Sequence, residues 1–291
     1  MILKEKYQAF LFVLPVIVLI SSLFFFPLIN TIALSFFKYL PSSQSYSFIG
    51  LENYLTLLFS QKFLFSLGVS IYFLIIGLIF SFLIGLGMAL LLNELSNKKF
   101  IIIIRGALIF PWVIAPLVAG LMFLLIFNPS FGILNTSLLK IGLISSNIYW
   151  LTFPPFLALN SVIFVDVWKN APWIMILLLA GLQSIPEYLY DAAKVDGANA
   201  IQRFIYITLP GLKPMIIVAL LFRGIWVLRT FDIIYILTRG GPGEYTKTLT
   251  YLAYEEVFQY FKLTEGSVII TIIVLLTLLF ALLYLKFLGR R

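Results

Sequence analysis

The sequence contains no cysteine and no histidine, and this absence removes most of the usual chemistry of enzyme active sites. Without cysteine the chain has no disulfide framework, no thiolate metal ligand and no thiol nucleophile. Without histidine it lacks the commonest general base and metal ligand. We therefore expect neither a cofactor nor a metal site.

Charged residues are also scarce: they make up 11% of the 291 residues, whereas 62% are hydrophobic. A soluble domain carries about a quarter charged residues. This composition excludes an ordinary water-soluble enzyme and indicates that lipid surrounds most of the chain. Leu, Ile and Phe occur in long runs rather than alternating with polar residues, which predicts helices and not a transmembrane barrel.

Six stretches are apolar enough to cross a bilayer, which takes about 20 helical residues. We expect an all-α polytopic membrane protein in which residues 1–291 form a single transmembrane domain with its core over 67–286. The apolar stretch after Lys4 and Lys6 is too long for a signal peptide and is expected to remain as the first helix. The six transmembrane helices are expected at 9–37, 67–93, 102–127, 157–184, 213–238 and 266–286.

The distribution of lysine and arginine predicts the orientation of these helices. An even number of spans places both termini on one side, where eleven of the 20 basic residues fall, against six on the other side. Short cytoplasmic segments are enriched in Lys and Arg, so both termini are expected to be cytoplasmic. The net charge of +8 then reflects topology and does not indicate nucleic-acid binding.

Two local patterns concern the shape of the bundle. Segment 48–58, in an outer loop, has apolar residues at helical spacing and is expected to lie along the membrane surface. The simplest role for such a helix is to cap the outer end of the bundle. Pro111, Pro116 and Pro172 interrupt the backbone hydrogen bonds of two spans and predict kinks there. Such kinks serve either alternating access or static packing.

The loop over 185–212, between the fourth and fifth spans, is too structured for a linker. Ser184 and Glu187 have the spacing of a capping box, with Pro186 in the first turn, so a helix is expected to start there. Asp196-Gly197 predicts a turn, and a second helical stretch runs on to Leu209, where Pro210 lets a new membrane helix begin. The loop is either a re-entry cap or a docking surface for a partner.

Seven positions of this loop resemble a known signature. Asp191-Ala192-Ala193, then three residues, Gly197, nine residues, Ile207, one residue and Leu209-Pro210 resemble the E-A-A-x3-G-x9-I-x-L-P signature of ABC importer permeases. Asp191 in place of Glu keeps the carboxylate on a shorter side chain. Segments 48–54, 180–186 and 237–242 resemble the carbohydrate-type subfamily, in particular the maltose-type and glycerol-phosphate-type permeases.

The resemblance implies roles for these residues. The helix that carries the signature is a coupling helix, which docks on a cytoplasmic ATPase subunit. The contact and its bend would be formed by Asp191, Ala192, Ala193 and Gly197. The membrane anchor of the loop would be formed by Ile207, Leu209 and Pro210.

The resemblance also implies partners and a location. The expected partners are ATP-binding-cassette ATPase subunits, a second homologous permease in a heterodimer, and an extracytoplasmic solute-binding protein that delivers a sugar-like solute. The chain would span the prokaryotic plasma membrane several times. Its own sequence lacks the phosphate-binding pattern GxxxxGK[ST], and the glycines at 240–243 have the composition of a turn, so ATP hydrolysis is expected in a separate subunit.

Ionisable residues within spans are costly and usually face a cavity or one another. Asp166 and Lys169 are three residues apart, as are Arg229 and Asp232, so each pair can close on one helix face. The fifth span also contains Arg223, and its charges and aromatic residues suit a translocation path, although packing or gating would also explain them. The two arginines there would suit an anionic solute such as a sugar phosphate or uronate, but Asp232 can neutralise one of them. The path candidates are Trp226, Arg229, Thr230, Phe231, Asp232 and Tyr235.

The leading hypothesis is an ABC importer permease that moves a sugar or related polyol by alternating access. One alternative is an ion-coupled secondary transporter in which Asp166 or Asp232 carries a proton or sodium ion. That alternative leaves the seven-position match unexplained. An intramembrane enzyme is a third possibility, but no convergent catalytic set is visible without His or Cys.

Overall fold

The computed structural model describes residues 2–40, 45–95 and 98–288. The chain packs as two compact units, one made of residues 1–64 and 252–275 and the other of residues 65–251 and 276–291. Within these described ranges, five helices are long and apolar enough to cross a membrane, or six if one bent pair is counted as a single span. The expected multi-span helical architecture is therefore present.

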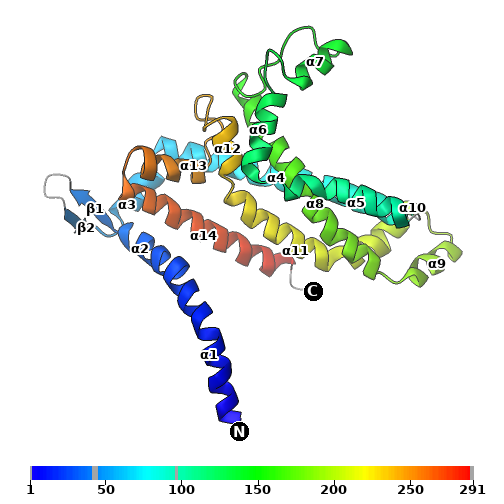
Figure 1. The fold of residues 1–291 in the computed structure, drawn as a ribbon, viewed down its shortest axis with the longest axis horizontal. Helices are drawn as coiled ribbons and strands as arrows, with labels where there is room; N and C mark the ends of the chain where they lie inside the picture. The colour runs from blue at the N-terminus through cyan, green and yellow to red at the C-terminus, as the bar shows by residue number, and fades with distance from the viewer. Residues whose placement is uncertain (1, 41–44, 96–97, 289–291) are drawn as a thin grey trace. The chain divides into compact units, whose positions relative to one another are not determined.

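The first unit begins with a helix that is apolar and unburied from Phe10 onwards. α1 (Ile2–Ile20) continues through a π-helical turn, η1 (Ser21–Phe25), into α2 (Phe26–Leu34), drawn in blue in Figure 1. The candidate span Phe10–Leu34 is 25 residues long, and its most apolar window is 0% buried. A helix that is apolar all round and unburied by protein suits contact with lipid.

A short β-hairpin follows, so the all-α expectation is wrong at this point. β1 (Phe37–Leu40) pairs antiparallel with β2 (Ser45–Phe48), which places Phe37 opposite Phe48 and Tyr39 opposite Tyr46. The ring centroids of these two pairs lie 5.5 and 5.2 Å apart, a distance at which aromatic pairs stabilise a hairpin. The expected first span therefore ends at Leu34 rather than at 37.

The surface helix expected over 48–58 is shorter than predicted. β2 takes up Phe48, Gly50 turns the chain with φ of 62°, and α3 (Glu52–Leu58) begins after that turn. The amide of Asn53 donates hydrogen bonds to the carbonyl oxygens of Ser35 and Phe37, at 3.0 and 2.8 Å. These bonds fix α3 to the end of the first span.

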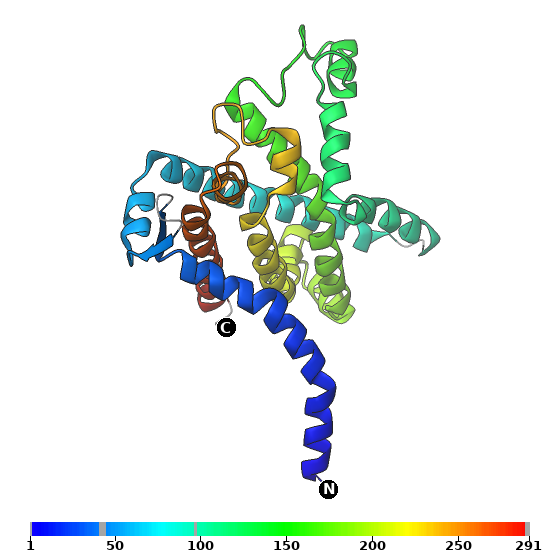
Figure 2. The ribbon, with the colours of Figure 1, turned by 60° about the vertical axis from the view of Figure 1, so that its left-hand side comes forward.

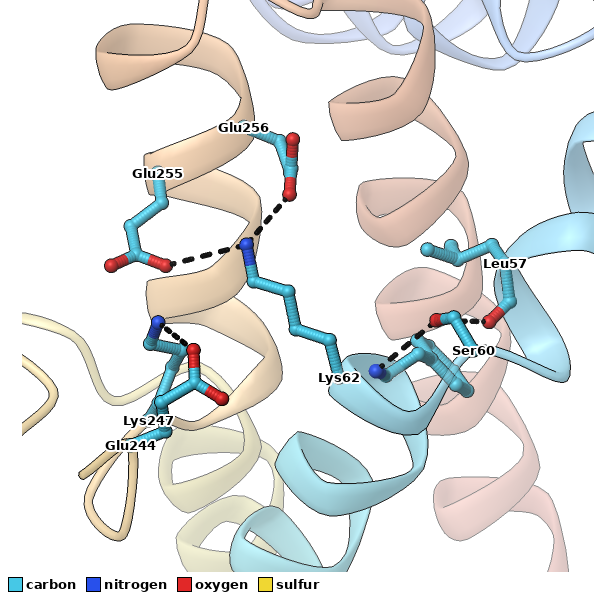
Figure 3. A network of polar contacts seen from close by, with 8 residues as sticks. Leu57, Ser60, Lys62, Glu244, Lys247, Glu255 and Glu256 are labelled. Carbon is cyan, nitrogen blue, oxygen red and sulfur yellow. Dashed lines mark hydrogen bonds and ion pairs between the residues drawn. The ribbon is translucent and has the colours of Figure 1, made fainter.

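A charge network stabilises the other half of the first unit. This half contains the π turn η3 (Glu255–Gln259) and the first part of α14 (Leu263–Leu288). The ammonium of Lys62 lies 2.9 Å from a carboxylate oxygen of Glu256 and 3.9 Å from one of Glu255, as Figure 3 shows. It also lies 4.9 Å from the ring centroid of Tyr260. One lysine thus compensates two buried carboxylates.

The second unit is a helical bundle built around α8. About 67% of the most apolar window of α8 is buried, against 22% or less for the other unbroken spans. Figures 1 and 2 both show α8 and α11 side by side. Besides the end of α14, the unit contains most of α4 (Gln61–Glu94), α5 (Lys98–Val113), α6 (Pro116–Ile126), α7 (Ile133–Lys140), α8 (Pro155–Ser184), α9 (Glu187–Val195), α10 (Ala200–Arg203), η2 (Phe204–Thr208), α11 (Leu209–Leu228), α12 (Asp232–Leu237) and the start of α13 (Leu249–Tyr254).

Two hydrophobic clusters occupy opposite halves of α8. In one, Val162 and Val165 pack with Phe73 of α4 and Ile234 of α12. In the other, Ile174 and Leu178 pack with Ala89 of α4 and Leu212 of α11. Gly85 permits the close approach of α4 to α8, because a Cβ there would lie 2.8 Å from the side chain of Ile174. The polar residues described below lie between these two clusters along α8.

The third expected span is broken into two helices. α5 and α6 meet at an angle of 96°, and Figure 2 shows the turn between them. Pro116 starts α6 and holds Ala115 in an extended conformation with ψ of 139°, which ends the preceding helix. Pro111 lies within α5, and α8 continues past Pro172. Of the three prolines, Pro116 is the one at which a helix is interrupted.

The fifth expected span, 213–238, has different limits. Helical structure is continuous from Ala200 to Leu228, so the new membrane helix does not begin at Pro210. The π turn η2 lies directly before Leu209-Pro210 and carries the chain past a proline that cannot donate a backbone hydrogen bond. The helix then ends at Arg229, and α12 starts at Asp232, whose carboxylate suits a helix N-terminus.

Candidate functional site

A polar cavity of about 330 Å³ lies in the second unit, at the break between α11 and α12. Four helices contribute to it: α6, α8, α11 and α12. The residues between α11 and α12, Arg229 to Phe231, are non-helical, and all of them line the cavity. The cavity is lined by Pro116, Asp166, Lys169, Asn170, Arg223, Trp226, Arg229, Thr230, Phe231, Asp232 and Ile233.

Five of the six path candidates from the sequence line this cavity, and the exception is Tyr235. Tyr235 lies behind Phe231, with which it stacks at a centroid distance of 5.4 Å. Phe231 also stacks with Tyr251 at 5.9 Å. Trp226 packs against Trp173 of α8 at 4.6 Å. The cavity therefore has a wall of aromatic residues beside its charged groups.

A buried arginine joins three helices next to the cavity. Arg223 of α11 donates from Nε to the hydroxyl of Ser81 on α4 at 3.1 Å, and from Nη2 to the carboxylate of Asp166 on α8. Arg223 is 0% exposed and Asp166 is 1% exposed. Removing one partner of such a buried pair leaves an uncompensated charge, at a cost of about 3–5 kcal/mol. The pair therefore fixes α11 to α8 at the depth of the cavity.

The two ion pairs predicted from sequence spacing do not form. Asp166 pairs with Arg223 from another helix, and the ammonium of Lys169 donates instead to the carbonyl oxygen of Trp112 at 3.2 Å. Arg229 and Asp232 form no ion pair in the described part of the chain, because the helix ends between them and they do not share a helical face. Spacing along one helix could not reveal a partner supplied by tertiary packing.

Three lining residues had drawn attention as intramembrane charges but not as path residues: Asp166, Lys169 and Arg223. Asn170 was missed, although its amide donates to the backbone and carboxylate oxygens of Asp166 at 2.8 and 3.1 Å. Ser81 was missed as well. A single serine in an apolar span gives no sequence signal for a role beside an arginine 142 residues away.

The loop between α8 and α11 is the second candidate site. α8 extends to Ser184, whose hydroxyl donates to the carbonyl oxygen of Gly181 at 2.7 Å, so the capping box predicted there is wrong. Ile185, before Pro186, is extended with ψ of 124°, and α9 begins at Glu187. The capping box instead joins Asn199 and Gln202, two residues after the turn, with bonds of 2.8 and 2.9 Å.

The expected coupling residues are grouped on α9 and its turn. Asp191 and Ala192 are exposed, and Ala193 is half-buried. Asp191 pairs with Lys194 at 2.9 Å. Gly197 has φ of 77°, a conformation that favours glycine, and it allows Ala198 to donate to the carbonyl oxygen of Ala193 at 2.9 Å. The turn after α9 is thus present as predicted.

The residues expected as a membrane anchor lie where the loop joins α11. Ile207 is half-buried in η2, whereas Leu209 and Pro210 are exposed at the start of α11. The hydroxyl of Tyr190 on α9 lies 2.9 Å from that of Thr208, which connects α9 to this segment. A cavity of about 600 Å³ lies beneath the loop, lined by both of these residues and by Arg203 and Glu94 among others.

The glycine cluster at 240–243 forms a turn, as predicted. Gly240 and Gly243 have φ of 79° and 55°. A Cβ at Gly240 would lie 2.8 Å from the ring of Tyr251, so only glycine fits against that ring. The hydroxyl of Thr246 donates to the carbonyl oxygen of Gly241 at 2.8 Å and closes the turn. The preceding element is the short helix α12, not the strand that a phosphate-binding loop requires.

Comparison with known proteins connects this geometry to one family. The family model described as binding-protein-dependent transport system inner membrane component matches residues 81–291. The trehalose/maltose transport system permease protein MalF of Thermococcus litoralis is 37% identical over 290 residues, which cover 99% of this chain and 95% of that protein. The sulfoquinovosyl glycerol transport system permease protein SmoG of Agrobacterium fabrum is 34% identical, with coverage of 99% and 92%.

A solved structure shares the fold over nearly the whole chain. It is the crystal structure of a bacterial ABC transporter involved in the import of the acidic polysaccharide alginate. The TM-score is 0.86 at 25% sequence identity, and the match covers 99% of this chain and 96% of the other. The sequence and the fold therefore match proteins of the same class.

Proposed function

Because the chain belongs to the family of binding-protein-dependent transport system inner membrane components, we propose that it moves a sugar or related polyol across the membrane by alternating access. It is the membrane permease component of an ABC importer and is not itself an enzyme. ATP is hydrolysed in a separate subunit. A second permease subunit and a solute-binding protein complete such an importer.

The cavity between α8, α11 and α12 is the observation that carries the proposal. Its charged side chains and its aromatic wall are the groups that bind the oxygens and the apolar ring faces of a sugar. The relatives named for trehalose/maltose and sulfoquinovosyl glycerol transport support a sugar-like solute. We assign the translocation path to Trp226, Arg229, Thr230, Phe231 and Asp232, with Tyr235 supporting Phe231 from behind.

The exposed loop between α8 and α11 is the proposed contact with the ATPase. Ala192 and Ala193 are small enough to let another surface approach closely, and Gly197 forms the bend. α11 follows the loop without a helical break and carries Arg223. A displacement of α9 would thus reach the cavity through α10, η2 and α11. In this proposal both termini are cytoplasmic and the two permease subunits are different.

The ion-coupled alternative has no support. A proton or sodium site would need a carboxylate that is free to exchange its partner. Asp166 is instead held by Arg223 and by Asn170. Asp232 is exposed at the start of α12, and the described residues contain no group of three or more acidic side chains that could hold a metal ion.

The test is uptake by the assembled importer in lipid vesicles. We expect uptake only when the permease is combined with its ATPase, its second permease and its binding protein, with ATP on the ATPase side. Dissipating proton and sodium gradients should leave the rate unchanged. Uptake that persists without the ATPase and collapses with an ion gradient would contradict the proposal.

A further inference from the structure

The cavity in the second unit carries more positive than negative charge. Its charged lining consists of three basic side chains, Lys169, Arg223 and Arg229, and two carboxylates, Asp166 and Asp232. Asp166 is paired with Arg223. Asp232 can compensate only one of the two remaining cations. One positive charge of the lining is therefore left without a carboxylate.

Lys169 is a cation of the lining that is almost completely buried. It is 7% exposed, in the middle of the most buried helix of the bundle. Its ammonium has three hydrogens to donate, but its single hydrogen bond in the described part of the chain is to the neutral carbonyl oxygen of Trp112. Asp166 and Asp232 are close enough to attract this ammonium, but neither bonds to it in the described residues. Its remaining donor hydrogens are therefore available to an anion in the cavity, to which a charge-assisted hydrogen bond would form.

Arg223 supplies a second donor that is already in place. Its Nε and Nη2 are held by Ser81 and Asp166, whereas Nη1 is buried and has no hydrogen-bond partner. The planar guanidinium cannot turn Nη1 away without losing the other two bonds. Nη1 therefore presents a fixed, unsatisfied donor beside a cavity that Arg223 lines.

We propose that Lys169 Nζ and Arg223 Nη1 together bind an acidic group of the transported solute, a carboxylate, sulfonate or phosphate. The inference rests on the proposed transport function and narrows its solute to an acidic sugar. Charge-assisted hydrogen bonds to such a group satisfy both donors and neutralise the surplus charge. Trp226 lines the same cavity and offers apolar surface for the sugar ring.

The experiment compares two small probes, glucuronate and glucose, which differ at C6 in a carboxylate against a hydroxymethyl group. Both are titrated into the full chain in lipid nanodiscs by calorimetry. Hydrogen bonds to a charged group favour glucuronate by about tenfold or more. Equal affinity for the two sugars, or no detectable binding of glucuronate, overturns the proposal.

Variants at Lys169 assign the preference to this residue. Lys169→Met keeps the length of the side chain and removes its charge, and should abolish the preference for glucuronate, whereas Lys169→Arg should retain it. Lys140→Met is the matched control, because Lys140 is exposed at the end of α7 and does not line the cavity. A preference that survives Lys169→Met overturns the proposal. If Lys169→Met does not fold, the comparison of the two sugars on the unmodified chain decides alone.

The assembled importer separates this inference from the function on which it rests. ATP-driven uptake restricted to neutral sugars would overturn the acidic-group site and leave the transport function standing. A preference for glucuronate in an assembly that imports nothing under ATP would support the acidic-group site and overturn the transport function.

Discussion

The cavity and the loop between α8 and α11 each contain an ion pair, and the two pairs differ in sequence separation and in burial. Arg223 and Asp166 are 57 residues apart in sequence, come from different helices and are almost completely buried. Asp191 and Lys194 are one helical turn apart, with side chains 61% and 57% exposed. The first pair ties the bundle together. The second is short-range and solvated, so the loop can exchange it for a contact with a partner at little cost.

The largest expected effect is on the buried pair. Arg223→Met leaves the carboxylate of Asp166 buried without its partner and should lower the free energy of unfolding by about 3–5 kcal/mol. Thermal unfolding of the purified chain in detergent measures this loss. Arg229→Met is the matched control, since Arg229 is exposed and has no ion pair in the described residues, and it should change stability by less than about 1 kcal/mol. Equal losses in the two variants would refute the structural role of the pair.

The contact between α4 and α8 offers the next largest effect. In Gly85→Ala the new methyl group would lie 2.8 Å from Ile174 and 3.0 Å from the carbonyl oxygen of Ala171, so the helices must separate. We expect a loss of about 1–3 kcal/mol in stability. Gly87→Ala, on the same helix, has no atom within 4 Å of the added methyl and should be neutral or slightly stabilising. The prediction fails if the two variants unfold at the same temperature.

In the loop between α8 and α11, the proposed contact with the ATPase, the expected effect is larger on transport than on stability. Gly197→Val forces a β-branched residue to adopt φ of 77°, which costs about 1–3 kcal/mol locally although the space around it is open. The bend after α9 should distort, so that ATP hydrolysis no longer drives uptake while the chain still inserts in the membrane. Gly142→Val is the control, because Gly142 has φ of 73° and open space outside this loop. Unchanged coupling in Gly197→Val would contradict the role given to the bend.

The smallest stability effect is expected at the exposed pair. Asp191→Asn should lower the free energy of unfolding by no more than about 1 kcal/mol, because solvated ion pairs contribute little. If Asp191 contacts a basic residue of the ATPase, the same variant should weaken ATPase binding to permease-containing vesicles. Lys194→Gln breaks the same internal pair and leaves the carboxylate in place. Equal weakening by both variants would show that the internal pair, not a contact of Asp191, matters for docking.

The same contrast explains which parts of the molecule could be predicted. The loop is built from neighbours in sequence, so its turn at Gly197 and the grouping of Asp191, Ala192 and Ala193 followed from the order of residues. The cavity depends on residues from several helices. Sequence spacing suggested pairs at 166/169 and 229/232, and packing instead brought Arg223 to Asp166 and ended the helix at Arg229.

Errors at helix ends have a similar cause. The capping box expected at Ser184 does not form, because Pro186 holds Ile185 in an extended conformation and α8 runs on to Ser184. The hydroxyl of Ser184 instead donates to the backbone within α8. The hairpin at 37–48 was hidden because its strands are four residues long and follow directly on an apolar span. At both places two local patterns predict different structures, and the sequence alone does not show which of them forms.

By itself, the sequence determined that this chain is a membrane protein, that it crosses the membrane several times as helices, and that one loop carries a signature that resembles that of ABC importer permeases. Those properties depend on composition and on residues a few positions apart. The tertiary structure decided which intramembrane charges meet, where the α5–α6 span bends and the fifth span ends, and which residues enclose the cavity. These depend on long-range packing, because the partner of a buried charge is whichever group the fold brings within hydrogen-bond distance.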